Sequence, residues 1–289
     1  MDIEITIEGP LDAISRLQEK LRDLSPELRP HGKHQQSLRI IETENGLDSR
    51  LLFISRALKG MSGLELRVRN LAYSEPVVVS SDEPFRPVGS LLIQPWHPFL
   101  PETPDPDTIV ILQQHAFGSG LHPTTILCLK GLEEIYREGP SLNGKEILDF
   151  GCGTGLLAIA AVKWGAQRAF GVEIDPASVL TARRNANLNR VAERITIVKG
   201  SWDAVGGAFD VIIANLVPAV IYRTGKRIRN YLRPQGRIIV SGFGDSQAPE
   251  MESFFTSAGL FPQQRTTLKG WGALTLSARN LNGGQINDF

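Results

Sequence analysis

Hydrophobic and polar positions alternate in short segments over roughly the first hundred residues. Residues 3–7 (IEITI) and 64–68 (LELRV) carry an apolar side chain at every second position, which is the period of a strand with one buried face. Between them, residues 11–24 repeat leucine and isoleucine every three or four positions, as an amphipathic helix does. We therefore expect a small α+β domain over residues 1–94.

A proline-rich stretch follows this segment. Residues 95–107 read PWHPFLPETPDPD, and proline both lacks the backbone N–H that a sheet needs and restricts the residue before it. The composition favours a linker between two domains.

The remaining chain, residues 108–289, alternates apolar strands with helices. Expected strands cover residues 146–150, 169–174, 195–198, 209–214 and 237–241. Helices are expected over residues 156–164 and after Asp175, an N-cap residue followed by Pro176 at the first helical position. Nearly continuous apolar strands alternating with helices predict an α/β fold with a doubly wound, mostly parallel sheet. Such sheets bind ligands at the carboxyl ends of their strands.

A glycine turn follows the first of these strands directly. Gly151, Gly153 and Gly155 come after EILDF and precede a helix, and the missing Cβ atoms allow a tight turn and close approach of a ligand. Leu156 stands where a dinucleotide-binding fingerprint has its third glycine, which disfavours a nicotinamide cofactor.

An acidic residue ends the next strand, 22 positions beyond Gly151. The carboxylate of Glu173 is suited to accept hydrogen bonds from both ribose hydroxyls of an adenosine-containing ligand. Asp175 is the alternative ribose ligand. A helix-starting acidic pair without any ligand also explains the pattern.

Asn215 ends the strand FDVIIAN and is followed by Leu216, Val217 and Pro218. Its amide oxygen could accept a hydrogen bond from an amine and direct the amine lone pair at a methyl group, although an N-cap role before Pro218 is also open. The glycine turn contains no lysine or arginine to neutralise a pyrophosphate. These features favour S-adenosylmethionine as the cofactor, bound by Gly151, Gly153, Glu173 and Asn215.

Composition and charge limit the expected partners and location of the protein. Lysine plus arginine equals aspartate plus glutamate at 31 each, so no overall field attracts nucleic acid or an anionic membrane. No apolar run approaches the ~20 residues of a membrane span, and the start lacks a signal-peptide pattern. Cys128 and Cys152 are the two cysteines, and His122 has no metal ligands at zinc-like spacing. We expect a cytoplasmic protein without a metal.

Four segments together resemble the bacterial family of ribosomal protein L11 methyltransferases, called PrmA. They read AFGSGLHPTTILCLKGLE, ILDFGCGTGLLAIAAVKWGA, FGVEIDPASVLTARRNANLN and FDVIIANL, in this order along the chain. FRPVGSLLIQPW and KGWGALTLSAR are also similar to the family, so the resemblance runs from about residue 85 to 271.

The resemblance implies a class I methyltransferase with S-adenosylmethionine as cofactor and a ribosomal protein as substrate. It implies that the AFGSGLHPTT loop folds over the cofactor, with Thr125 in contact and with Phe117 and His122 shaping the mouth. It also implies a ferredoxin-like N-terminal domain that recognises the substrate protein on a flexible linker, and methylation of lysine side chains and an α-amino group. We expect a monomer that needs neither nucleic acid nor a membrane.

Departures from the family pattern leave the substrate open. Residues 71–83, 113–115 and 216–218 differ from the usual family sequence, so a related enzyme acting on another protein is an alternative. An RNA-directed methyltransferase is a second one, because residues 222–237 (YRTGKRIRNYLRPQGR) hold six basic residues and no acidic one. A solvated helix face also explains that segment.

Overall fold

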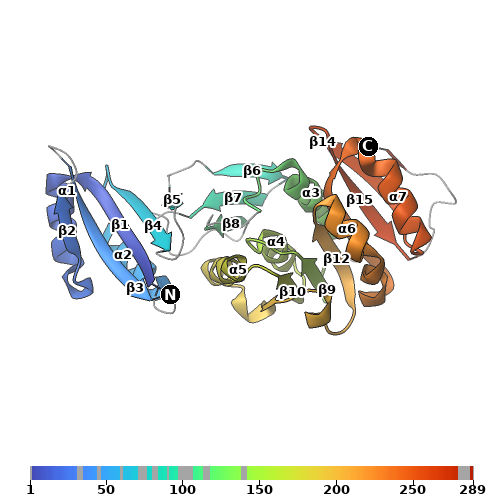
Figure 1. Cartoon of the computed structure of the whole chain (residues 1–289), viewed down its shortest axis with the longest axis horizontal. Coiled ribbons are helices and arrows are strands. Elements are labelled where there is room, and N and C mark those ends of the chain that lie inside the picture. The colour runs from blue at the N-terminus through green and yellow to red at the C-terminus, as the bar shows by residue number, and fades with distance from the viewer. Residues whose placement is uncertain are drawn as a thin grey trace. The chain divides into compact units, whose positions relative to one another are not determined.

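The computed structural model describes residues 2–30, 35–43, 47–58, 61–70, 77–79, 84–89, 91–96, 107–112, 118–137, 142–278 and 287–288. Packing divides the chain into two compact units (Figure 1). The smaller unit comprises Met1–Glu83, Pro95–Pro104 and Leu112–Gln114, and the larger comprises Pro84–Gln94, Asp105–Ile111 and His115–Phe289. The boundary expected after residue 94 differs from this division, and most of the expected linker lies outside the described residues.

The smaller unit is an antiparallel sheet with two helices. Its elements are β1 (Asp2–Pro10), α1 (Leu11–Lys20), the 3₁₀ turn η1 (Arg22–Leu24), β2 (Glu27–Pro30), β3 (Gln35–Thr43), α2 (Leu47–Leu58), β4 (Glu65–Asn70) and β5 (Val77–Val79). The strand order is β2-β3-β1-β4-β5, and β1 pairs antiparallel with both β3 and β4. The alternating pattern of residues 3–7 and 64–68 thus becomes two neighbouring strands.

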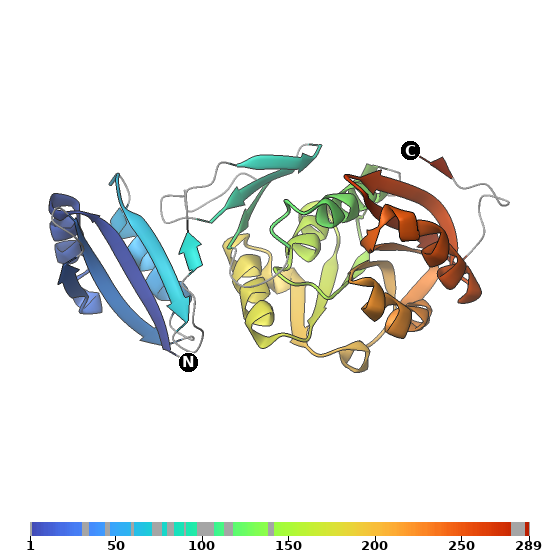
Figure 2. The same ribbon diagram turned by 45° about the horizontal axis from the view of Figure 1, so that its top comes forward.

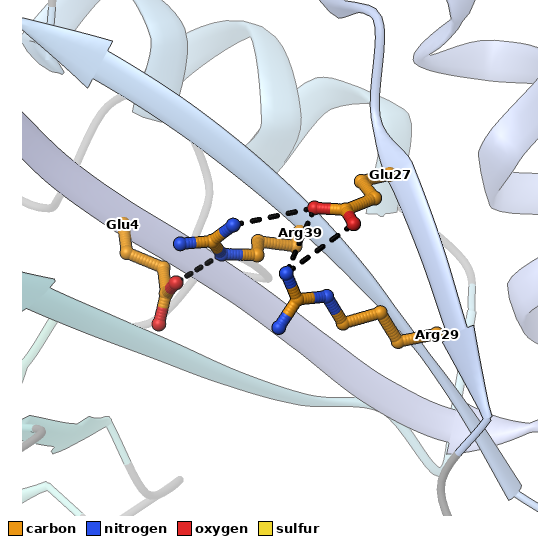
Figure 3. A network of polar contacts seen from close by, with 4 residues as sticks. All are labelled: Glu4, Glu27, Arg29 and Arg39. Atoms are coloured by element: carbon orange, nitrogen blue, oxygen red, sulfur yellow. Dashed lines mark hydrogen bonds and ion pairs between the residues drawn. The ribbon is translucent and has the colours of Figure 1, made fainter.

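Period-two alternation gives this sheet one apolar and one polar face. Ile5 and Ile7 of β1 are fully buried with Ile14 and Leu17 of α1, because the helix covers that face. Intervening positions of β1, β2 and β3 carry an ion-pair network of Glu4, Glu27, Arg29 and Arg39 (Figure 3).

Arg39 joins the carboxylates of two strands in this network. It contacts Glu4, and its Nη1 lies 3.2 Å from Glu27 Oε2. Hydrogen bonds from Arg29 and then Arg39 lower the pKa of Glu27. These four residues therefore pair their charges on the polar face, partly across neighbouring strands, and exposed pairs of this kind add little stability.

The larger unit is built on a twisted sheet of order β11-β10-β9-β12-β13-β15-β14-β16 (Figure 2). Its strands are β9 (Glu146–Phe150), β10 (Arg168–Glu173), β11 (Ile195–Lys199), β12 (Phe209–Asn215), β13 (Leu232–Gly244), β14 (Phe261–Leu268), β15 (Trp271–Ser277) and β16 (Asn287–Asp288). The first five strands of that order are parallel, and β15 is antiparallel to β13 and β14. The predicted doubly wound, mostly parallel sheet is confirmed.

Helices cover both faces of this sheet. They are α3 (Pro123–Arg137), α4 (Leu156–Lys163), α5 (Pro176–Leu188), α6 (Pro218–Thr224) and α7 (Ala248–Ser257), with 3₁₀ turns η2 (Ala192–Arg194), η3 (Trp202–Ala204), η4 (Gly225–Tyr231) and η5 (Asp245–Gln247). Val211 and Ile213 belong to the core cluster with α3, α4 and α5, whereas Ile212 belongs to the cluster with α7. In chain order, β10 and β11 are added on one side of β9, and β12 and β13 are then added on the other side. This change of side is the topological switch point of the sheet, so the carboxyl ends of β9, β10 and β12 are the expected ligand site.

A small sheet of β6 (Phe85–Val88), β7 (Leu91–Pro95) and β8 (Thr108–Ile111) completes the larger unit. Val88, Leu91 and Ile93 pack in the same core cluster as Ile109 and Ile111. This packing explains why residues 84–94 belong with the larger unit and not with the N-terminal domain that the sequence pattern predicted. Within the described part of the chain, no helix is long and apolar enough to cross a membrane.

Candidate cofactor and catalytic site

A pocket of about 650 Å³ lies at the carboxyl ends of β9, β10 and β12. Its walls come from the glycine turn, from the residues after β10 and β12, from the start of α3 and from β13 and β15. Lining residues include His122, Thr124, Gly151, Gly153, Glu173, Asp175, Ser201, Asn215, Leu216, Arg223, Gly242 and Trp271. The volume is in the usual range for small-molecule sites.

The glycine turn after β9 requires its glycines. Gly151, Gly153 and Gly155 have φ angles of +75°, +51° and +79°. This region of backbone conformation is energetically unfavourable for a residue that carries a Cβ atom. The N–H of Gly151 donates to the carbonyl oxygen of Val172 at 2.8 Å, which ties the turn to the end of β10. A Cβ on Gly155 would lie 3.1 Å from that of Ala182 in α5. The turn therefore exposes backbone to the pocket and lets two helices approach closely.

The first glycine loop lies against this turn. Thr154 donates its hydroxyl to the carbonyl oxygen of Gly118 at 2.7 Å. Gly118 and Gly120 have φ angles of +113° and +90°, and a Cβ on Gly120 would lie 2.4 Å from Ile93 and 3.2 Å from Leu156. Leu156, where the third fingerprint glycine would stand, thus packs against the first loop instead of opening the turn to a pyrophosphate.

The chain around the start of α3 brings His122 and Thr124 to the pocket. His122 Nδ1 lies 2.8 Å from Thr124 Oγ1, and the His122 ring meets the edge of Trp271 with centroids 4.8 Å apart. Thr125 is buried and is not part of the lining, whereas Thr124 is. The hydroxyl oxygen of Thr125 accepts from Asn215 Nδ2 at 3.4 Å. Direct contact of Thr125 with a cofactor stays a prediction, and Phe117 lies outside the described residues.

The two acidic residues after β10 have different hydrogen-bond partners. Glu173 Oε2 accepts from the N–H of Gly153 at 3.0 Å, and Oε1 accepts from those of Ile174 and Asp175 at 2.8 and 3.1 Å. Asp175 Oδ2 accepts from the amide and hydroxyl of Ser178 at 2.8 and 2.7 Å and so caps α5. Both carboxylates line the pocket, and Asp175 is engaged in capping α5, so Glu173 stays the predicted ribose ligand.

Asp149 is a buried acid that the sequence reasoning missed. Its Oδ2 accepts from the N–H of Ala158 at 3.1 Å and so anchors the first turn of α4. Burial raises its pKa to about 7, opposed by the Ala158 hydrogen bond and assisted by the negative charge of Glu173. A carboxylate inside the apolar run ILDF, next to the glycine turn, was the available signal.

Asn215 projects its amide at the end of β12. The N-cap of α6 is Val217, without a side-chain cap, so the capping interpretation of Asn215 is wrong. Its Nδ2 donates to Thr125, and its Oδ1 accepts no hydrogen bond from any residue in the described part of the chain. Asn215 therefore offers one carbonyl oxygen as an acceptor in the wall of the pocket.

The basic segment is only partly free to meet an anion. Arg233 pairs with Asp210 at 2.6 Å and with Glu146, and Arg229 donates to the carbonyl oxygen of Gly259. The pKa of Asp210 is lowered overall. Burial acts to raise this pKa, but the hydrogen bonds from the N–H of Glu146 and from Arg233 together act more strongly in the opposite direction. Arg223, Lys226 and Arg227 are also exposed, and Lys226 Nζ lies 5.7 Å from the centroid of the Phe254 ring.

The strand order and the site define a class of protein. The sheet is parallel with one antiparallel strand near its edge. With a glycine turn after β9, a carboxylate after β10 and an amide after β12, it has the fold of the class I S-adenosylmethionine-dependent methyltransferases. The residues fit this cofactor, because the pocket presents the carboxylate of Glu173, the backbone of the glycine turn and the amide of Asn215. Among the described residues, no cluster could hold a metal ion.

Comparison with known proteins gives the family. The ribosomal protein L11 methyltransferase (PrmA) family matches residues 75–279, and the chain belongs to it. The chain is 39% identical over 156 residues to a ribosomal protein L11 methyltransferase of Aliivibrio fischeri (strain MJ11), and 37% identical over the same length to one of Vibrio parahaemolyticus. These matches cover 53% of this chain and 51% of each relative, so the chain spans about half the length of these curated relatives.

A solved structure supports the same fold. The ribosomal protein L11 methylase of Lactobacillus delbrueckii subsp. bulgaricus superposes with a TM-score of 0.61 at 27% identity. The superposition covers 69% of this chain and 100% of that one. The resemblance stated from the four sequence segments is confirmed.

Proposed function

We propose that this protein transfers methyl groups from S-adenosylmethionine to amines of ribosomal protein L11, both lysine side chains and the N-terminal amine. The observation that carries the proposal is the meeting of Gly153, Glu173 and Asn215 in one pocket, on a chain that belongs to the PrmA family. Each residue lies at the end of a different parallel strand or turn, where this fold binds its ligand.

The chain's own residues act by binding and orientation. When bound, the cofactor supplies a sulfonium methyl group that a neutral amine attacks in line, with sulfur keeping the electrons of the broken bond. Asn215 Oδ1 accepts a hydrogen bond from the amine and directs its lone pair, while Glu173 and the glycine turn fix the cofactor. Most of the rate enhancement then comes from holding the reactants in a near-attack geometry.

The amine must lose a proton before it reacts. A lysine with a pKa near 10.4 is neutral only at about the 0.1% level at pH 7. A partly dry pocket beside a cation lowers that pKa, so the reaction needs no dedicated base, and the proton leaves to solvent. We assign Asn215 orientation and not proton transfer.

Incubation with labelled S-adenosylmethionine and purified ribosomal protein L11 tests the proposal. Mass spectrometry should find added methyl groups on lysine side chains and on the N-terminal amine. A labelled cell extract analysed in the same way identifies any other substrate. Label on another protein, with none on ribosomal protein L11, would favour the related enzyme with a different substrate.

The smaller unit is proposed to recognise the protein substrate. A pocket that admits one amine side chain has little contact area, so affinity and choice of partner require a larger surface. A fragment of residues 84–289 keeps β6 and β7 and the core residues that they bury. It should bind S-adenosylmethionine like the full chain but methylate ribosomal protein L11 far less efficiently. Equal efficiency would exclude this role for the smaller unit.

One observation keeps an RNA-directed activity as a second candidate. Arg223 of α6 and Lys226 and Arg227 of η4 are exposed, and Arg223 lines the pocket. RNA binding that weakens steeply with salt, and that is lost when these three residues become alanine, would favour this candidate. We further propose that the protein is a cytoplasmic monomer, which sedimentation at micromolar concentration tests for the oligomeric state.

A further inference from the structure

The end of β13 packs directly on the residue that follows Asn215. Gly242 has a φ angle of +105° and lies where the pairing of β13 with β15 shifts register. A Cβ on Gly242 would lie 2.0 Å from the carbonyl oxygen of Leu216 and 2.9 Å from its nitrogen. These are backbone atoms, so no side-chain rotation could relieve the clash. The position needs glycine both for its φ angle and for this contact.

The peptide of Leu216 is held from other directions as well. Its N–H donates to the carbonyl oxygen of Ser241 at 3.0 Å, and the hydroxyl of Ser241, fully buried, donates to the carbonyl oxygen of Gly272 at 2.8 Å. The Leu216 side chain reaches within 2.6 Å of where a Cβ on Gly151 would stand. Backbone of β13 and of the glycine turn therefore confines the chain directly after Asn215.

We propose that Gly242 is a positioning residue for the methyl transfer proposed above, because its bare backbone fixes the Leu216 peptide and thereby the amide of Asn215. Among the described residues, the Asn215 amide makes a single long hydrogen bond, at 3.4 Å to Thr125. That bond alone holds the side chain weakly. Its position hence depends on the backbone that follows it, and a misplacement of about 1 Å can cost about a hundredfold in rate.

Gly242→Ala tests this role. The variant should lower kcat on ribosomal protein L11 at least tenfold, while the Kd for S-adenosylhomocysteine stays within threefold, because Glu173 ends β10 and Gly153 lies in the turn after β9, and neither is part of β13. Gly244→Ala is the matched control in the same strand. Gly244 has a φ angle of −68°, and a Cβ there would meet nothing closer than 3.6 Å. It should leave kcat, Kd and thermal stability near wild type.

A second readout does not depend on the substrate. In the S-adenosylhomocysteine complex, Gly242→Ala should shift the NMR signals of the Asn215 side-chain amide but not the backbone amide of Gly153, and Gly244→Ala should shift neither. If Gly242→Ala does not fold, Ser241→Ala should give a milder loss of kcat, about threefold to tenfold, with unchanged Kd and a smaller shift of the same Asn215 signals.

The outcomes separate this inference from the proposed function. An unshifted Asn215 amide in a folded variant overturns the positioning role, whatever the substrate is. Losses of kcat and of cofactor affinity in equal proportion also overturn it, since they indicate a merely structural glycine. A wild-type protein inactive on ribosomal protein L11 refutes the proposed substrate, and the NMR comparison still decides the role of Gly242.

Discussion

The hydroxyl of Thr154 donates a 2.7 Å hydrogen bond to the carbonyl oxygen of Gly118, 36 residues earlier in the chain. Thr154 is fully buried, and its own carbonyl oxygen accepts from Asn185 Nδ2 of α5 at 2.9 Å. Through its hydroxyl and its backbone carbonyl, one residue of the glycine turn thus joins that turn to the first glycine loop and to α5. The two glycine-rich segments form one structural unit around the ligand site.

Removal of this hydroxyl should loosen the first loop. Thr154→Val keeps the shape but leaves the carbonyl of Gly118 without its donor, which costs about 0.5–1.5 kcal/mol for a typical hydrogen bond. The affinity for S-adenosylhomocysteine should fall about twofold to tenfold in calorimetry. Thr154→Ser keeps the donor and should bind nearly as wild type. Tighter binding by the valine variant would mean that the loop does not assist the cofactor.

The two acidic residues after β10 should separate binding from stability. Glu173→Gln removes a charged acceptor and should weaken S-adenosylhomocysteine binding by about tenfold or more, since hydrogen bonds to charged groups contribute about 1.5–3 kcal/mol. Asp175→Ala removes the N-cap of α5 and should lower stability by about 0.5–2 kcal/mol. Its effect on affinity should be small. The opposite assignment would appear as a larger affinity loss for Asp175→Ala than for Glu173→Gln.

The buried carboxyl of Asp149 should make stability depend on pH. Its pKa is about 7 in the folded protein, against 3.8 for an ordinary aspartate, so between these values the folded state retains a proton that the unfolded state has lost. The stabilisation from this group is present in full below about pH 4 and is lost as pH rises through about 7.

Asp149→Asn provides the comparison. Asparagine keeps an oxygen that can accept from the N–H of Ala158 and does not titrate. Urea titrations at several pH values give the difference in unfolding free energy between wild type and variant. Between pH 4 and 7 this difference should change with pH, with a slope that corresponds to the binding of up to one proton. Parallel curves over that range would show that Asp149 does not titrate there.

Asn215 should matter more for turnover than for affinity. Asn215→Ala removes the oxygen that orients the amine, an interaction that strengthens in the transition state, so kcat should fall at least tenfold at saturating substrate. The Kd for S-adenosylhomocysteine should change by less than about threefold in calorimetry. Unchanged turnover would count against the orienting role.

Local chain signals predicted which residues meet at the carboxyl ends of the strands. Gly151, Glu173 and Asn215 could be placed together because each directly follows an apolar strand, and parallel strands present their carboxyl ends at one edge. Asp149 and Gly242 could not be placed in this way. Their partners, the N–H of Ala158 and the backbone of Leu216, are set by helix packing and by a register shift in β13.

The N-terminal boundary shows a second limit. Residues 85–88 and 91–95 form two short strands, which the sequence pattern assigned, apart from Pro95, to the N-terminal domain. Their assignment depends on pairing with β8 across an intervening stretch, a nonlocal contact that no short window of sequence contains. Thr125 shows the same limit on a smaller scale, since helix geometry turns Thr124 toward the pocket and Thr125 toward Asn215.

Calorimetry of cofactor binding tests the central claim most directly. The full chain should bind S-adenosylmethionine and S-adenosylhomocysteine at one site, and Gly151→Val should weaken both strongly, because that position has a φ angle of +75° and a Cβ would lie 2.6 Å from Leu216. NAD should bind far more weakly or not at all. Binding of NAD with equal or higher affinity, or an affinity for S-adenosylmethionine that Gly151→Val leaves unchanged, would contradict the account.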